Sequence, residues 1–171
     1  MKINNMNTII MNWSGPFYDR EEIKYYDLNN GIYSFFSTKK YSRDDNMLLE
    51  YIGKTEINMY DRLYNHHIWY ELNDTKCLWF GNIINKRIVD LDLIEHNFIY
   101  FCEPILNKKK VFSKPYESTI IISEFLKKDG ERYINQPYYL KYIPELIYWN
   151  KKTNTLKISN RLEIIDYNIQ I

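Results

Sequence analysis

Two short apolar runs, residues 31–36 and 48–52, constrain the fold of this chain most. The first is rich in aromatic and β-branched side chains, which favour a strand over a helix. Residues 38–47 between the runs are polar and charged, so we expect them to form a loop. Because two strands joined by a loop pair most simply as an antiparallel hairpin, a hairpin is the first element that the sequence predicts.

Hydrophobic periodicity predicts three further elements after the hairpin. Residues 58–69 carry apolar side chains at helical spacing, and residues 78–84 resemble a third strand. Residues 90–101 again show helical spacing, and Pro104 is expected to end that helix.

The remaining parts of the chain give weaker signals. Residues 19–23 predict a short helical turn near the start. Residues 119–128 have the pattern of a helix, with Gly130 as its stop signal. The apolar runs 146–149 and 155–158 predict a late hairpin.

Together these elements predict an α+β fold with a small antiparallel three-stranded sheet, flanked by helices, and a C-terminal α/β extension. We expect residues 1–171 to form one domain, with a core over residues 29–115 and a packed extension over residues 116–171. The extension is expected to pack on the core because no Gly/Ser-rich or Pro-rich linker precedes it.

Composition narrows the class of protein. Apolar residues make up 45% of the 171 residues and aromatic residues 17%, which excludes a disordered chain. Cys77 and Cys102 have no metal-ligand spacing, and we see neither a bilayer-spanning apolar run nor a cleavable leader. These features predict a reduced, cytoplasmic protein with no membrane association.

The net charge is only +1, so any phosphate binding must use local clusters rather than a strongly basic surface. Lys108, Lys109, Lys110 and Lys114 form the sharpest such cluster, with no acidic residue among them. An ordinary solvated loop is the alternative interpretation of three adjacent lysines.

Several short polar signals follow one another along the chain. In order they are Gly31-Ile32-Tyr33, Tyr51-Ile52-Gly53, Arg62 with His66, Glu95, and Asn107. This series resembles the GIY-YIG nuclease superfamily over about residues 29–110. The portion from Glu95 to Asn107 looks especially like the nuclease domain of the bacterial excinuclease, a repair incision enzyme.

Cleavage of a phosphodiester needs a nucleophilic water, a group that takes its proton, a cation for the phosphate charge, and help for the leaving oxygen. Arg62 suits the phosphate because its guanidinium is always charged and offers a planar fork of donors. His66 could transfer a proton near neutral pH. His67 lies about 100° away on a helix and is expected to face solvent.

By the resemblance, Glu95 is the metal-binding glutamate and holds one divalent ion, Mg²⁺ or Mn²⁺. A hard cation of this kind prefers carboxylate, water and phosphate oxygens. Glu95 is one residue from the apolar stripe of its helix, where a side chain can reach a cleft. Without the resemblance, a solvated acid on a helix face would be the ordinary interpretation.

The resemblance also makes Tyr33 a general base or a water-positioning group, with Tyr51 as its partner. A phenol has a pKa near 10, so a base would need a nearby cation such as Lys54. The sequence leaves open whether Tyr33 or His66 is the base, and both tyrosines also fit cross-strand core positions. Asn107 matches the family's asparagine and is expected to hold the site together.

The sequence therefore predicts a metal-dependent endonuclease that hydrolyses DNA phosphodiester bonds, as a compact stand-alone or restriction-like enzyme. Lys54, Asn107, Lys108, Lys109 and Lys110 are the expected substrate-binding residues. A non-catalytic nucleic-acid-binding domain and a structural or interaction protein are the alternatives. The extension could complete the core, contact DNA or form the surface of a homodimer.

Overall fold

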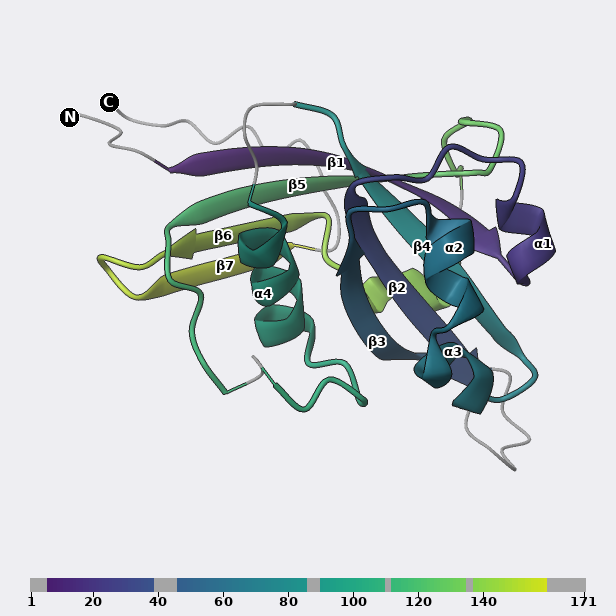
Figure 1. Ribbon diagram of the computed structural model, residues 1–171. Helices are drawn as coiled ribbons and strands as arrows, with labels where there is room; N and C mark the ends of the chain where they lie inside the picture. Colours follow the sequence, from purple (N-terminus) through teal and green to yellow (C-terminus); the bar gives the residue numbers. More distant parts are fainter. Residues whose placement is uncertain (1–5, 39–45, 86–89, 110–111, 135–136, 160–171) are drawn as a thin grey trace.

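The computed structural model describes residues 6–38, 46–85, 90–109, 112–134 and 137–159. Within these residues, seven strands form one mixed sheet in the order β3-β2-β4-β1-β5-β6-β7 (Figure 1). The strands are β1 (Asn7–Phe17), β2 (Gly31–Thr38), β3 (Met47–Thr55), β4 (Lys76–Ile83), β5 (Thr119–Leu126), β6 (Leu146–Asn150) and β7 (Thr155–Ser159).

The helices of the described chain are few and short. They are α1 (Arg20–Ile23), α2 (Met59–Tyr64), α3 (His67–Glu71), α4 (Leu91–Cys102) and the 3₁₀ helix η1 (Tyr138–Tyr142). No helix among them has the length and apolar character needed to cross a membrane.

The expected small three-stranded sheet flanked by helices, with a C-terminal α/β extension, is wrong. β1 pairs antiparallel with β4 and parallel with β5, so the N-terminal and C-terminal strands continue one curled sheet. The first strand does have a recognisable sequence pattern. Ile9, Met11, Trp13 and Phe17 are buried at alternating positions, as in a strand with one face covered.

β5 corrects a second expectation, because residues 119–128 are not a helix. Burial in β5 alternates strictly, with Ile121, Ser123 and Phe125 buried and the residues at the intervening positions half-buried. Three successive isoleucines fit this strand well, since β-branched side chains pack on a pleated surface. Pairing with β1 over eight residues then overrides the apparent helical spacing.

Other expected elements are confirmed. β2 and β3 form the antiparallel hairpin, β4 adds the next strand, and β6 and β7 form the late hairpin. α4 matches the helix predicted before Pro104, and α1 begins after Asp19, whose side chain caps its first turn. The helix predicted over residues 58–69 is broken into α2 and α3, and the break falls at His66.

The sheet has an apolar cluster on each face. One cluster joins Trp13, Trp79 and Phe98 with strand residues and with Leu140 of η1. The other lies under α1, α2 and α3 and contains Tyr33, Phe35 and Trp69 among others. Figure 1 shows α4 on one side of β3 and the pair α2 and α3 on the other. β3 is an edge strand, and this position lets residues from both sides meet there.

Phe125 connects the C-terminal strands to the core. Its ring stacks on Trp13 at a centroid distance of 6.3 Å and meets Trp79 edge-on at 5.9 Å. We expect Phe125→Ala to lower the free energy of unfolding by about 3–5 kcal/mol, measured by urea denaturation. Phe112→Ala is the matched control, because Phe112 is 92% exposed and its truncation should be nearly neutral. If Phe125→Ala and Phe112→Ala lowered the free energy of unfolding equally, Phe125 would not connect the C-terminal strands to the core.

Candidate active site at the edge strand β3

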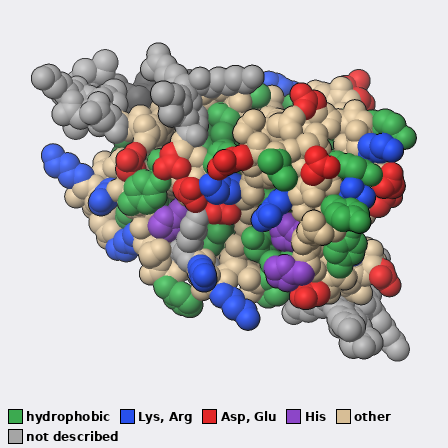
Figure 2. Space-filling view, viewed as in Figure 1, with side chains coloured by type: hydrophobic (Ala, Val, Ile, Leu, Met, Phe, Trp, Pro, Cys, Tyr) green, Lys and Arg blue, Asp and Glu red, His purple; other side chains and the backbone are tan. Residues whose placement is uncertain are grey.

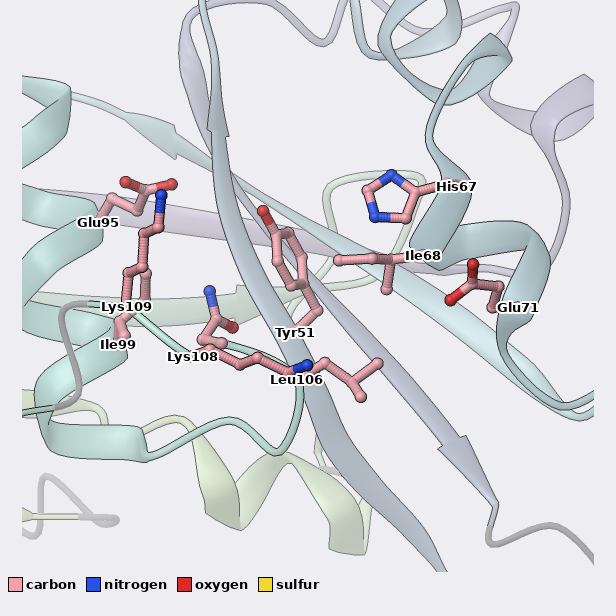
Figure 3. Close-up of a pocket in the computed structure, with 10 residues that line it drawn as sticks. Tyr51, His67, Ile68, Glu71, Glu95, Ile99, Leu106, Lys108 and Lys109 are labelled. Atoms are coloured by element: carbon pink, nitrogen blue, oxygen red, sulfur yellow. The ribbon is translucent and has the colours of Figure 1, made fainter.

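A groove of about 420 Å³ lies at β3, between α4 and α3 (Figure 3). Figure 3 shows Glu95 and Lys109 on the α4 side, His67 and Glu71 on the α3 side, and the Tyr51 side chain between them. The complete lining is Tyr51, His67, Ile68, Glu71, Glu95, Ile99, Leu106, Asn107, Lys108 and Lys109. Basic and acidic side chains are mixed over this face of the molecule (Figure 2).

Tyr33 lies directly beneath this region and is fully buried. It pairs with Gly53 across the β2–β3 ladder. A Cβ atom on Gly53 would come within 2.5 Å of the Tyr33 hydroxyl and 2.8 Å of the Tyr51 ring. Glycine at position 53 therefore makes the space in which the two tyrosines approach each other, with ring centroids 6.1 Å apart.

The Tyr33 hydroxyl is held by two neighbours. Arg62 Nε donates to it over 3.4 Å, and His66 Nε2 lies 2.8 Å away. Because the hydroxyl is buried, we assign its hydrogen to the bond with His66 Nε2, the acceptor within reach. Arg62 and His66 were expected on one helix, yet they reach Tyr33 from α2 and from the residue preceding α3.

Burial sets the charge states of this group. It raises the pKa of Tyr33 far above that of a free phenol, with a further contribution from Tyr51 that Arg62 only partly offsets. Burial also lowers the pKa of His66 to about 4, and the positive charge of Arg62 acts in the same direction. Both side chains are therefore neutral at pH 7, while the hydrogen bond to Tyr33 raises the pKa of Arg62.

Lys54 does not serve the tyrosines as expected. Its ammonium group binds Asp92 at 2.8 Å and Glu56 at 3.2 Å, and the bond to Asp92 is the main reason that its pKa is raised. The cation beside the Tyr33 phenol is Arg62 instead. Lys54 contributes to the site mainly through its backbone N–H, which donates to Glu95 Oε1 over 3.1 Å.

Glu95 extends from α4 into the groove. Within the described ranges no cluster of three or more His, Cys, Asp or Glu side chains has the geometry of a metal site. One carboxylate in an open groove does fit Mg²⁺, which keeps several waters and uses one or two carboxylates with substrate phosphates.

Asn107 and its neighbours fasten the segment after α4 to the outer edge of β3. The Asn107 side chain accepts from the backbone N–H of Ile52 and donates to the carbonyl of Ile52, both at 2.8 Å. Leu106 N donates to the carbonyl of Glu50 over 2.8 Å. This geometry gives Asn107 a positioning role and places Lys108 and Lys109 at the groove, whereas Lys110 lies outside the described residues.

The sequence did not indicate that three residues of α3 line the groove. His67 is exposed, as expected, and its side chain also lines the groove, while the adjacent His66 is 5% exposed and points inward. Ile68 and Glu71 follow His67 on α3. A helical projection over residues 58–69 could not find them, because the chain leaves the helix at Asn65 and begins a new one at His67.

Comparisons with protein-family models, with curated protein sequences and with solved structures found no match to this chain. The functional interpretation therefore depends on the geometry of the groove and on the residues beneath it.

The lowered pKa of His66 predicts a pH dependence of stability. The pKa is about 4 in the folded protein against an ordinary value of 6.5, so the unfolded chain binds this proton more readily. Stability from this residue is complete above pH 6.5 and is lost as the pH falls through 4. Urea denaturation should show a loss of up to about 3 kcal/mol over this range, which His66→Gln reduces.

His67→Gln is the control for this measurement, because it removes the neighbouring imidazole and leaves the buried one. It should keep most of the wild-type pH dependence of stability, because burial and Arg62 lower the pKa of His66 more than His67 does. A His66→Gln protein whose pH dependence equals that of the wild type would show that the buried imidazole is not the cause.

Proposed function

We propose that this protein is a metal-dependent phosphodiester hydrolase that acts on DNA. The observation that supports the proposal most is the convergence of five residues from separate parts of the chain. Tyr33, Arg62 and His66 form one hydrogen-bonded group, and Tyr51 packs against it with its ring 5.3 Å from that of His66. Glu95 lines the same groove as Tyr51.

The charges at the groove suit a phosphodiester. Arg62 lies on the exposed surface of α2 while its Nε contacts the buried Tyr33, so its guanidinium is anchored at one end. Such an anchored fork of donors can stabilise the charge that develops on a phosphate. Lys108 and Lys109 extend the positive charge along the groove, where they would contact the flanking backbone of DNA without reading its sequence.

Glu95 is the residue that would hold the divalent ion. An ion bound there would neutralise phosphate charge and polarise the phosphoryl oxygen. The hydrogen bond from Lys54 N fixes the direction of the carboxylate, and Lys54 is fixed in turn within β3. The role of the protein is thus to present one oriented carboxylate in an open groove, with Arg62 near enough for the charge of Glu95 to raise its pKa.

Glu95→Gln should abolish Mg²⁺-dependent conversion of supercoiled plasmid to nicked or linear DNA, because it removes the charge but keeps the size of the side chain. The Gln side chain can still accept from Lys54 N, so the fold and DNA binding should persist. Glu103→Gln, at the end of the same helix and outside the groove, should cut like the wild type. Wild-type cleavage by Glu95→Gln would contradict the assigned role.

Arg62→Lys should lower the cleavage rate by about 10²–10³-fold, since an ammonium group cannot copy the planar fork of a guanidinium. The measurement is single-turnover plasmid cleavage at fixed Mg²⁺. Arg132→Lys is the matched control, because the Arg132 side chain is 81% exposed and pairs with Glu124. If both variants cut equally fast, Arg62 would be an ordinary surface arginine.

A further inference from the structure

Hydrolysis needs a group that takes a proton from the attacking water, and this group must reach the groove. Tyr33 and His66 are the two candidate bases between which the sequence leaves the choice open. Neither lines the groove, since Tyr33 is 0% exposed and His66 is 5% exposed. Their hydrogen-bonding atoms are directed at each other, at 2.8 Å.

The protonation states of Tyr33 and His66 are a second argument against either residue as the base. Burial raises the pKa of Tyr33, so its phenolate is not accessible near neutral pH. Nε2 of His66 already accepts from Tyr33, and its Nδ1 is buried with no hydrogen-bond partner in the part of the chain that the structure describes. Tyr33 is therefore a positioning residue that holds Arg62 from beneath, and His66 holds Tyr33 in turn.

His67, unlike Tyr33 and His66, is accessible from the groove. It is the first residue of α3, it is exposed, and its imidazole stands at the wall of the groove facing Tyr51 and Glu95 (Figure 3). Its ring lies nearly parallel to that of His66, with the centroids 6.0 Å apart. Of the candidate bases, His67 combines a basic nitrogen with access to a bound substrate.

We infer that His67, and not His66 or Tyr33, is the catalytic residue that takes the proton from the attacking water. The inference rests on the proposed function. The water oxygen forms a bond to phosphorus while its proton passes to the neutral imidazole of His67. The bond from phosphorus to the leaving deoxyribose oxygen breaks, and that oxygen takes a proton from solvent. The imidazolium then returns its proton to solvent, so the sum is the addition of one water.

The groups that face His67 come from each element packed around it. They are His66, Tyr51, Glu71, Glu95, Lys108 and Lys109. Only an imidazole that carries no extra proton can take one from water, so a base of this kind works less well at acidic pH. The cleavage rate should therefore fall as the pH is lowered.

The test is the pH–rate profile of plasmid cleavage in Mg²⁺ for wild type, His67→Gln, His67→Gly and Tyr70→Ala. We expect His67→Gln to lose about 10²–10⁴-fold in rate and to lose the acidic fall of the profile. Added imidazole should restore part of the activity of His67→Gly, which a structural role would not predict. Tyr70→Ala, exposed on the same helix and outside the groove, should keep the wild-type rate and profile.

The outcomes separate the inference from the proposed function. If His67→Gln keeps the wild-type rate and acidic fall while Glu95→Gln is inactive, His67 is not the base and the hydrolase proposal stands. If the wild-type protein shows no metal-dependent cleavage, the proposed function fails and the inference with it. Loss of rate in His67→Gln without imidazole rescue of His67→Gly, and with the acidic fall intact, also overturns the inference.

Discussion

The double pairing of β1 is the interaction on which the rest of the structure depends. β1 joins β4 on one side and β5 on the other, so the N-terminal strand links the strands of the hairpin region to those of the C-terminal third of the chain. Met11 and Trp13 of β1 are completely buried. The N–H of the Trp13 ring donates to Ser123 of β5 over 3.2 Å, which gives this buried polar group a partner. β2 and β3, which carry the strand residues of the candidate site, are thereby connected through β4 to the rest of the sheet.

The candidate site uses backbone groups that an edge strand leaves unpaired. The outward N–H groups of Ile52 and Lys54 donate to Asn107 and Glu95, and the carbonyl of Glu50 accepts from Leu106 N. An exposed strand edge is normally a liability for aggregation. In this protein the same edge orients the carboxylate of Glu95 and anchors the segment that brings lysines to the groove.

The two adjacent histidines, His66 and His67, differ in burial, and this difference determines what each imidazole can do. His66 is enclosed by Tyr33, Phe35 and Tyr51, and this environment keeps its imidazole neutral far below the usual pH. His67 is next in sequence but faces solvent and the groove. A buried, neutral imidazole is suited to holding Tyr33, which in turn accepts from Arg62, whereas an accessible imidazole is suited to exchanging protons with a substrate.

The sequence by itself determined the local elements: the β2–β3 hairpin, α4 before Pro104, and the polar residues that these elements carry to the site. Local patterns suffice for such elements because side-chain spacing and β-branching act within a few residues. Only the tertiary structure decided that residues 119–126 form a strand, since parallel pairing with β1 joins segments about a hundred residues apart. It also decided which histidine faces the groove, because the break between α2 and α3 is set by how both helices pack on the sheet.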